Sequence, residues 1–252
     1  MIRMMGMIAL AALATATAGA QDDAAPQRVL VVVAHPDDEL FMAPAIAALA
    51  REGAQVRVIH ATQGDAGPGV SNLPPGEKLA QVRAMEAFCS VDALGARTSV
   101  NLKLGDGKLG IAAHHPGSQA QLLGEGIAPY LMRSDLVLTW GPDGGYGHAD
   151  HRMVSVLTTQ IVQAMSEENR PRLLYVAIPT GSLPPVPEMA RWATTDPALL
   201  TETIAYTPAD LAAAKAAAQC HVTQFDAASR EGMMGLFDAT MWRGRVHFRP
   251  AF

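Results

Sequence analysis

Cysteine is nearly absent from this chain: Cys89 and Cys220 are the only two in 252 residues. Neither lies in a C-x-x-C pair or in the spacing of a zinc knuckle, so the sequence argues against a metal site built from thiolates. Excess positive charge is also lacking, because 24 acidic residues outweigh 19 Lys and Arg residues and give a net charge of -5. Such a chain has no general electrostatic attraction to nucleic acid or to an anionic membrane surface.

Long apolar runs are missing as well, except at the N-terminus. Arg3 precedes an apolar stretch over residues 4–16, and Ala18-Gly19-Ala20 forms an A-x-A cleavage signature. The alternative is a short membrane anchor, but the stretch is short for a span and no second run of about 20 apolar residues follows. The sequence therefore predicts a secretory signal peptide over residues 1–20 and an exported protein, periplasmic or secreted, with no stable membrane span after cleavage. The mature chain, residues 21–252, has the length of one ordinary α/β domain.

Export bears on the two cysteines, because an oxidising compartment permits disulfides. Cys89 and Cys220 both fall in segments with a helical pattern. At this stage two readings stay open: a disulfide between them, or two isolated buried thiols.

The mature chain alternates strand patterns and helix patterns without an internal repeat. Strand patterns cover 29–34, 55–62, 98–104, 134–140 and 172–178, and helix patterns cover 41–52, 77–94, 119–132, 154–165 and 208–221. This alternation predicts right-handed βαβ units and hence an α/β fold, a Rossmann-like doubly wound, mainly parallel sheet with helices on both faces. The Pro-rich segment 179–207 is expected to run extended over the surface, and residues 242–252 to add a last edge strand.

The run from Val29 to Ala34 is apolar throughout and rich in β-branched residues, which is typical of a strand buried on both faces. It stops at His35-Pro36-Asp37-Asp38-Glu39, where Pro36 cannot donate a hydrogen bond to a strand ladder. Open α/β sheets bind their ligands at the carboxyl ends of such strands. The charged cluster could be a solvated acidic turn, but its position favours a functional site.

A second polar cluster, Gly141 to His151, follows the strand pattern that ends at Trp140. Its glycines predict a loop, after which His148, Asp150 and His151 arrive at the start of a helix. Strands one and four are neighbours in the commonest doubly wound order, so the two clusters are expected to face each other. A lone histidine is most often a hydrogen-bonded structural residue. Here, however, two histidines and an acid are expected to meet a His-x-x-Asp set. A purely structural role for the histidines does not explain this combination well.

These residue types suit a hydrolytic metal site. His35 and Asp38 with one later histidine offer three N and O ligands and leave positions open for water and substrate, as catalytic zinc sites require. The same set also suits non-haem iron. Asp37 lies beside the ligands and can take a proton from water, and the spare imidazole of His148 can donate a proton or stabilise an oxyanion. Asp150 can orient a histidine ligand.

The segment Ala34-His35-Pro36-Asp37-Asp38-Glu39, together with Gly147-His148-Ala149-Asp150-His151, resembles the PIG-L/LmbE-like family of metal-dependent N-acetylglucosaminyl deacetylases. The resemblance runs from about Val29 to Gln224 and so covers most of the mature chain. The lead-in Gly144-Gly145-Tyr146-Gly147 is most similar to the branch that deacetylates the mycothiol precursor. It implies a single deacetylase domain over residues 21–252.

The resemblance also implies roles for individual residues. The metal ligands fall on His35, Asp38 and His151, with Zn2+ as the expected metal and Fe2+ or another divalent metal as the alternative. The catalytic residues are a base, an acid or oxyanion-stabilising histidine, a carbonyl-polarising tyrosine and an orienting acid: Asp37, His148, Tyr146 and Asp150. Substrate contacts fall on Arg83, Asp106 and Asp65.

Some of these substrate contacts have plainer explanations, and two positions depart from the family's pattern. Arg83 fits equally well as a helix-surface ion pair with Glu86 or Glu77, and Asp106 as a turn residue. Asp65 stands where the family usually has Glu, which bears on sugar specificity. Ala149 stands where it usually has Pro and replaces no functional group.

The resemblance implies a hydrolase that removes an N-acyl group, expected to be acetyl, from an amino sugar such as an N-acetylglucosaminyl compound. Export points to a sugar of the cell envelope or the medium as its small-molecule substrate. Two alternatives stay open: an exported metal-dependent amidase or esterase on a non-sugar substrate, and a non-catalytic carbohydrate-binding relative. Asp37 argues against the second, because pure binding needs no proton acceptor beside the metal. The sugar, the physiological metal and the oligomeric state stay open.

Overall fold

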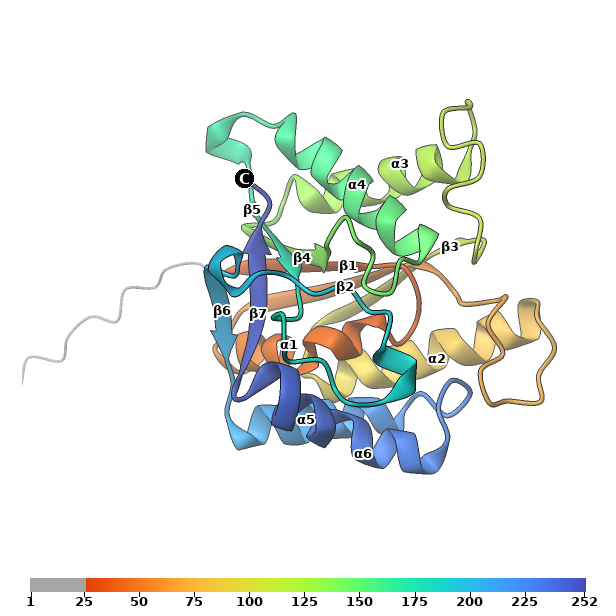
Figure 1. Ribbon diagram of the computed structural model, residues 1–252. Coiled ribbons are helices and arrows are strands. Elements are labelled where there is room, and N and C mark those ends of the chain that lie inside the picture. Colours follow the sequence, from red (N-terminus) through yellow and green to blue (C-terminus); the bar gives the residue numbers. More distant parts are fainter. Residues whose placement is uncertain (1–25) are drawn as a thin grey trace, which may run out of the picture.

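A seven-stranded sheet forms the centre of the molecule (Figure 1). The computed structural model describes residues 26–252, so the signal peptide expected over residues 1–20 lies outside the described residues. The strands are β1 (Arg28–Val33), β2 (Gln55–Thr62), β3 (Thr98–Leu104), β4 (Leu136–Trp140), β5 (Arg172–Val176), β6 (Glu202–Ala205) and β7 (Arg245–Pro250). Their spatial order is β3-β2-β1-β4-β5-β7-β6, in which β1 to β5 run parallel and β6 and β7 pair antiparallel.

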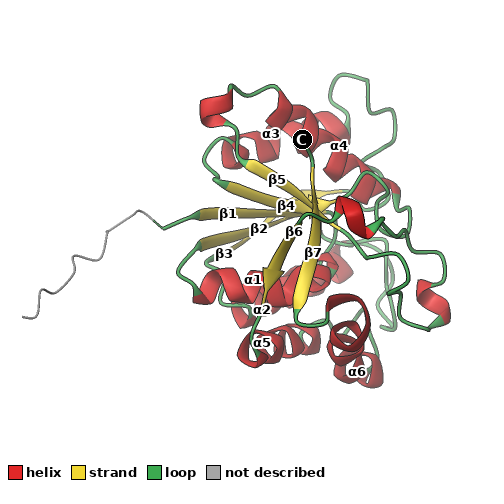
Figure 2. Cartoon of the chain, turned by 60° about the vertical axis from the view of Figure 1, so that its left-hand side comes forward, coloured by secondary structure: helices red, strands yellow, loops and turns green. Residues whose placement is uncertain are grey.

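Helices cover both faces of this sheet. They are α1 (Ala43–Arg51), α2 (Glu77–Ala93), α3 (Gln119–Leu131), α4 (Ala149–Gln163), α5 (Pro208–Gln219) and α6 (Ala227–Phe237). Figure 1 shows α3 and α4 above the sheet and the other four below it, and Figure 2 shows the same layers from another side. The predicted fold class, a doubly wound and mainly parallel α/β sheet, is confirmed. Within residues 26–252, no helix is long and apolar enough to cross a membrane.

The apolar run of β1 is buried on both faces, which explains why it lacks polar alternation. Val29, Val31 and Val33 pack into the apolar cluster that includes residues of α1, α5 and α6. Leu30 and Val32 point the other way, into the cluster with residues of α3 and α4. Burial of this kind contributes roughly 25 cal/mol for each Å² of apolar surface removed from water. It fixes β1, and therefore the loop that follows it, at the middle of the sheet.

The C-terminal part of the chain differs from the sequence-based expectation. The sequence predicts that residues 242–252 form the edge strand, but β7 lies between β5 and β6. The edge strand is β6, which comes from the Pro-rich segment 179–207. The helix α6 is not predicted, because Gly232 and Gly235 weaken its helical pattern. The Asp226 side chain caps its first turn by accepting from the Ser229 backbone N–H at 2.7 Å.

A disulfide joins two helices of the lower layer. Cys89 in α2 and Cys220 at the end of α5 are bonded, with their Cα atoms 5.8 Å apart. Of the two readings that the sequence leaves open, the bridge is therefore the one that forms.

Candidate active site

The two polar clusters meet at the carboxyl edge of the sheet, where β1 and β4 lie side by side. These strands pair in parallel, with Val32 opposite Thr139. After β1 the chain enters a short 3-10 helix, Asp38–Met42. After β4 a glycine-rich loop leads to α4, which has His148 as its N-cap. The helix thus begins five residues before the helical pattern of 154–165, and the prediction that His148, Asp150 and His151 lie at its start is confirmed.

Two imidazole nitrogens and one carboxylate, all candidate metal ligands, converge between these loops. His35 Nδ1 lies 3.2 Å from His151 Nε2. Asp38 lies 3.1 Å from His151 Nε2 through Oδ1 and 3.6 Å from His35 Nδ1 through Oδ2. Ligand atoms about 2.0–2.2 Å from a tetrahedral zinc are separated by roughly 3.3 Å. The three side chains are buried, and their spacing matches a metal site.

The hydrogen bond at the far side of each ring determines which nitrogen is free. His151 Nδ1 lies 3.1 Å from the carbonyl oxygen of Gly144, so it carries the proton and leaves a lone pair on Nε2. His35 Nε2 lies 3.0 Å from Asp106 Oδ1 and 3.3 Å from Asp150 Oδ2, so its neutral ring leaves a lone pair on Nδ1. Two lone pairs and a carboxylate then face one another, which only a cation between them would stabilise. The donor set therefore fits a divalent metal.

The carboxylates behind His35 are themselves held by the backbone. Asp150 is fully buried and accepts from the Gly107 backbone N–H at 2.7 Å. Asp106 is also buried and contacts His35 from the loop after β3. Burial opposes protonation of His35, but Asp106, Asp150 and Asp38 hold its pKa well above the usual value.

His148 differs from His151 in the nitrogen that is engaged. Its Nδ1 accepts the backbone N–H of Asp150 at 3.2 Å, so the neutral ring carries its proton on Nε2. Burial lowers the pKa of His148, which favours the neutral ring. Its ligand atom lies within 4.8 Å of those of His35 and His151, so a three-histidine set is also close at hand. Of His148 and His151, however, only His151 directs a lone pair at the cluster; His148 offers a hydrogen-bond donor.

Tyr146 lies at the rim of the cluster. Its ring centroid is 5.2 Å from that of His151 and 5.7 Å from that of His148. Burial, and then the charge of Asp38, raise the pKa of Tyr146 to about 12. The phenol stays protonated and, with 47% of the residue exposed, can donate to a bound molecule.

Asp37 lies beside the three ligand atoms without being one of them. Its φ of 103° is one that few residues other than glycine adopt, and such strain is concentrated at functional sites. Burial raises the pKa of Asp37 to about 6; the positive charge of Arg83 opposes this shift, and Asp38 adds to it. A bound divalent cation would lower this pKa, because it favours the charged carboxylate. An ionised carboxylate at this place can accept a proton.

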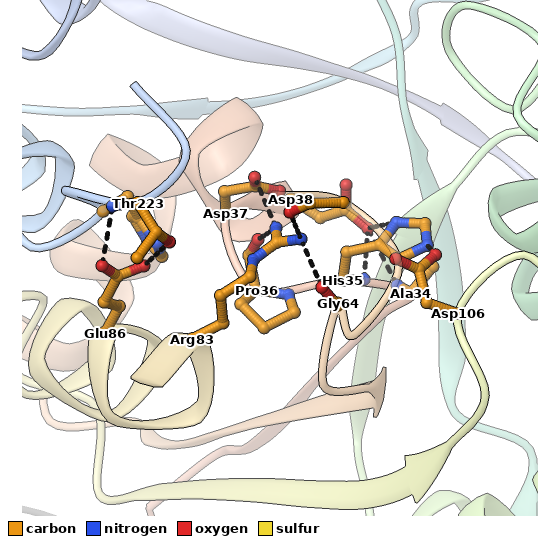
Figure 3. A network of polar contacts seen from close by, with 12 residues as sticks. Ala34, His35, Pro36, Asp37, Asp38, Gly64, Arg83, Glu86, Asp106 and Thr223 are labelled. Carbon is orange, nitrogen blue, oxygen red and sulfur yellow. Dashed lines mark hydrogen bonds and ion pairs between the residues drawn. The ribbon is translucent and has the colours of Figure 1, made fainter. Parts of the chain in front are cut away.

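Arg83 holds two loops together from α2 (Figure 3). Its guanidinium donates to the carbonyl oxygens of Pro36 at 2.7 Å and Gly64 at 3.0 Å, and to Asp37 Oδ2 at 3.0 Å. A Cβ on Gly64 would lie 2.2 Å from the guanidinium, so any other residue there would force the Arg83 side chain to shift. Arg83 is buried and pairs with Asp37, so the alternative of a helix-surface ion pair is wrong. Its contact with substrate stays a prediction.

Asp65 and Asp106, the other predicted substrate contacts, touch each other. Asp65 Oδ1 accepts the backbone N–H of Asp106 at 2.9 Å. Asp106 is more than a turn residue, because its side chain reaches His35. The structure thus brings all ten predicted site residues to one edge of the sheet, and their individual roles stay predictions.

Glu39 is a buried residue to which the sequence assigned no role. Its Oε1 accepts from Ser90 Oγ at 2.5 Å and His221 Nε2 at 2.7 Å, and its Oε2 from His60 Nε2 and the Asp37 backbone N–H, both at 3.0 Å. Burial alone would raise the pKa of Glu39, but His221 and His60 lower it below its usual range. His60, a histidine inside the apolar strand pattern of β2, is the sequence signal that could have indicated a buried polar partner. Glu39 fixes the backbone at Asp37.

Comparison with known families agrees with these motifs. The family model PIG-L, described as GlcNAc-PI de-N-acetylase, matches residues 30–162. A 1D-myo-inositol 2-acetamido-2-deoxy-alpha-D-glucopyranoside deacetylase from Corynebacterium urealyticum is 32% identical over 80% of this chain and 72% of its own length. A protein of the same description from Corynebacterium glutamicum is 33% identical, and there the match covers 60% of this chain and only 56% of that protein.

Solved structures share the fold at lower identity. An N,N'-diacetylchitobiose deacetylase from Pyrococcus horikoshii superposes with a TM-score of 0.66 at 20% identity, over 89% of this chain and 83% of that one. A 4-carboxy-2-hydroxymuconate hydratase from Pseudomonas putida gives a TM-score of 0.59 at 17% identity, over 90% of this chain and 96% of that one. One fold thus carries different reactions, and the site must decide between them.

Proposed function

Because the chain belongs to the PIG-L family, we propose that it is a metal-dependent hydrolase that removes an N-acyl group from an amino sugar. The reaction adds water across the amide: the bond between carbonyl carbon and nitrogen breaks, a carbon–oxygen bond forms, and a carboxylate and a free amine result. The observation that carries this proposal is the convergence of His35 Nδ1, His151 Nε2 and the Asp38 carboxylate within 3.6 Å, beside Asp37.

His35, Asp38 and His151 would hold the metal. Two imidazoles and a carboxylate are typical of catalytic zinc, and Zn2+ is the ion we propose first; Fe2+ accepts the same donors. When bound, such an ion lowers the pKa of water and polarises an amide carbonyl. Asp150 and Asp106 keep the proton of His35 on Nε2, so that Nδ1 stays available.

The remaining side chains move protons and stabilise charge. Asp37 takes the proton of the attacking water. Its carboxylate is buried, and burial raises its pKa, which makes it a better proton acceptor. His148 donates from Nε2 to the carbonyl oxygen as negative charge develops there, and the Tyr146 hydroxyl assists. The proton that Asp37 has taken from water then passes to the amine nitrogen as it leaves.

We further propose that the protein acts outside the cytoplasm, on an amino sugar of the cell envelope or the medium. The sequence pattern of residues 1–20 supports export. The bond between Cys89 and Cys220 adds support, because disulfides persist mainly in oxidising compartments.

The direct test is a panel of N-acylated sugars and non-sugar amides, incubated with the metal-loaded mature protein, with free amine as the readout. We expect amine from N-acyl amino sugars. Asp37→Asn is the control, because it keeps the metal ligands and should reduce turnover by roughly 10²- to 10⁴-fold. Amine release from non-sugar amides alone would show that the substrate is not a sugar. No release from any compound would refute the proposed hydrolase.

A further inference from the structure

A large pocket opens directly from the candidate active site. It has a volume of 720 Å³, and Asp37 and Asp38 form part of its wall. Pockets that enclose drug-sized ligands measure about 300–1,000 Å³. An acetyl group would leave most of this space unfilled, so the pocket has room for a larger part of the substrate.

The walls away from the two aspartates are mostly apolar. They come from the 3-10 helix after β1, from the segment 186–192 and from α6, and include Phe41, Met189, Trp192, Phe225, Met233 and Phe237. The few polar side chains there are Glu188, Gln224 and Ser229, with the Tyr146 hydroxyl nearer the cluster. Sugar hydroxyls placed against the apolar part of these walls would lose hydrogen bonds to water and find few partners in return. An aliphatic chain would gain from the same burial.

The polar groups that suit a sugar lie on the other side of the cluster. Asp65 and Asp106 do not line this pocket. In Figure 3, Asp106 lies on one side of Asp38 and Thr223 on the other. The pocket extends on the Thr223 side, since Gln224, the next residue, lines it. An amide whose carbonyl lies at the cluster therefore has one substituent beside polar groups and the other in the apolar pocket.

We infer that the apolar pocket receives the acyl chain of the substrate, and that this chain is a medium-length aliphatic one in place of acetyl. The inference rests on the proposed hydrolase function and specifies its substrate class. Asp37, as the base beside the reacting carbon, lies in the pocket wall, so the group that fills the pocket is continuous with the bond being cut. Hydrolysis then releases a fatty carboxylate into the pocket and an amino sugar on the polar side.

The helix α6 provides a matched pair of variants. A Cβ added at Gly232 or at Gly235 meets no atom within 4 Å, so both positions have space for a side chain. Gly232 lines the pocket and Gly235 does not. Gly232→Phe therefore places a ring in the pocket, and Gly235→Phe is a control in the same helix.

The test compares kcat/KM for N-acetyl-, N-butanoyl- and N-octanoyl-glucosamine, with octyl N-acetylglucosaminide as a fourth substrate. We expect kcat/KM to rise with acyl length by up to about fourfold per buried methylene, and by tenfold or more in all. Gly232→Phe should reduce the octanoyl-to-acetyl ratio at least fivefold, and Gly235→Phe should keep it. Calorimetry should show that octanoate binds the wild type more tightly than Gly232→Phe.

The outcomes separate this inference from the proposed function. Amine release from the acetyl compound at a rate equal to or above that from the octanoyl compound would overturn the acyl pocket and keep the hydrolase. A preference for the octyl glycoside would also overturn it, because the chain would then be on the amine side. No amine from any substrate would refute the hydrolase, and absent octanoate binding would refute the pocket independently.

Discussion

At the scale of single residues, the two histidines three positions apart differ in the ring nitrogen that is free. His151 donates from Nδ1 to the Gly144 carbonyl and directs Nε2 at the cluster, whereas His148 uses Nδ1 to cap α4. We expect His151→Ala to lose the metal and the activity. His148→Ala should keep the metal and lose about 10²-fold or more in kcat, because oxyanion stabilisation acts in the transition state.

Metal content by elemental analysis and kcat on the same preparations check this assignment. His35→Ala is the positive control for metal loss, since His35 Nδ1 belongs to the same three-atom set. If the metal is lost in His148→Ala and kept in His151→Ala, His148 is the ligand and His151 the oxyanion-stabilising residue.

Glu39 is expected to position Asp37 without touching the substrate. Its carboxylate accepts four hydrogen bonds, among them the Asp37 backbone N–H. An amide nitrogen cannot accept, so Glu39→Gln leaves buried donors unpaired, at about 1–3 kcal/mol each. We expect lower stability, retained metal, and kcat reduced about tenfold with KM little changed, as positioning effects on catalysis allow. A folded variant with wild-type kcat would show that Arg83 is sufficient to position Asp37 and that Glu39 is not needed for it.

The sequence predicted the meeting of the two motif loops, because strand order alone brings the ends of β1 and β4 together. It could not predict what Arg83 and Glu39 contact. Arg83 reaches from α2 to loops that come earlier in the chain, and the partners of Glu39 include His221, 182 positions away. Such contacts depend on how helices pack on the sheet, which local pattern does not encode.

At the scale of elements, strands and helices with strong periodicity were predictable and the C-terminal ones were not. β6 is a short edge strand in which every second residue is exposed. It is hard to recognise in the sequence because it lies within a Pro-rich segment. α6 carries two glycines, which have low helix propensity, and its stability comes from packing of Met234 and Phe237 into the core. Tertiary contacts therefore decide both elements.

The start of α5 shows how a strong local signal becomes a measurable stability. Thr207 and Asp210 form a reciprocal capping box, and Arg51 of α1 donates to Asp210 Oδ1 at 2.9 Å. Burial would raise the pKa of Asp210, but Arg51 and Thr207 hold it below 3.8. The stability from the charged form is thus present above pH 3.8 and is lost as the pH falls through the lower, folded-state pKa.

We expect Asp210→Asn to reduce the free energy of unfolding by about 1 kcal/mol at pH 7. The difference from wild type should shrink as the pH falls below 3.8, because Asp210 of the unfolded chain then takes up a proton, and it should vanish below the lower, folded-state pKa. Urea unfolding of both proteins across this range measures it. A difference that does not change with pH would mean that the charge of Asp210 contributes nothing.

At the scale of the whole molecule, the disulfide connects the elements that hold the base. Cys89 precedes Ser90, and Cys220 precedes His221; both of these neighbours reach Glu39 Oε1. Glu39 in turn fixes the Asp37 backbone. The bond also closes a loop between residues 131 positions apart, which restricts the unfolded chain. It should therefore affect both stability and catalysis.

The double change Cys89→Ser and Cys220→Ser is expected to reduce the free energy of unfolding by about 2–5 kcal/mol. Well below its melting temperature, kcat should fall several-fold while the metal stays bound, because Ser90 and His221 hold Glu39 less firmly. Asp210→Asn is the matched control: it weakens the other end of α5 and has no contact with Glu39. If stability falls in both variants but kcat falls only in the cysteine variant, the bond acts through the base. An equal kcat in the two variants would show that the disulfide contributes to stability and not to catalysis.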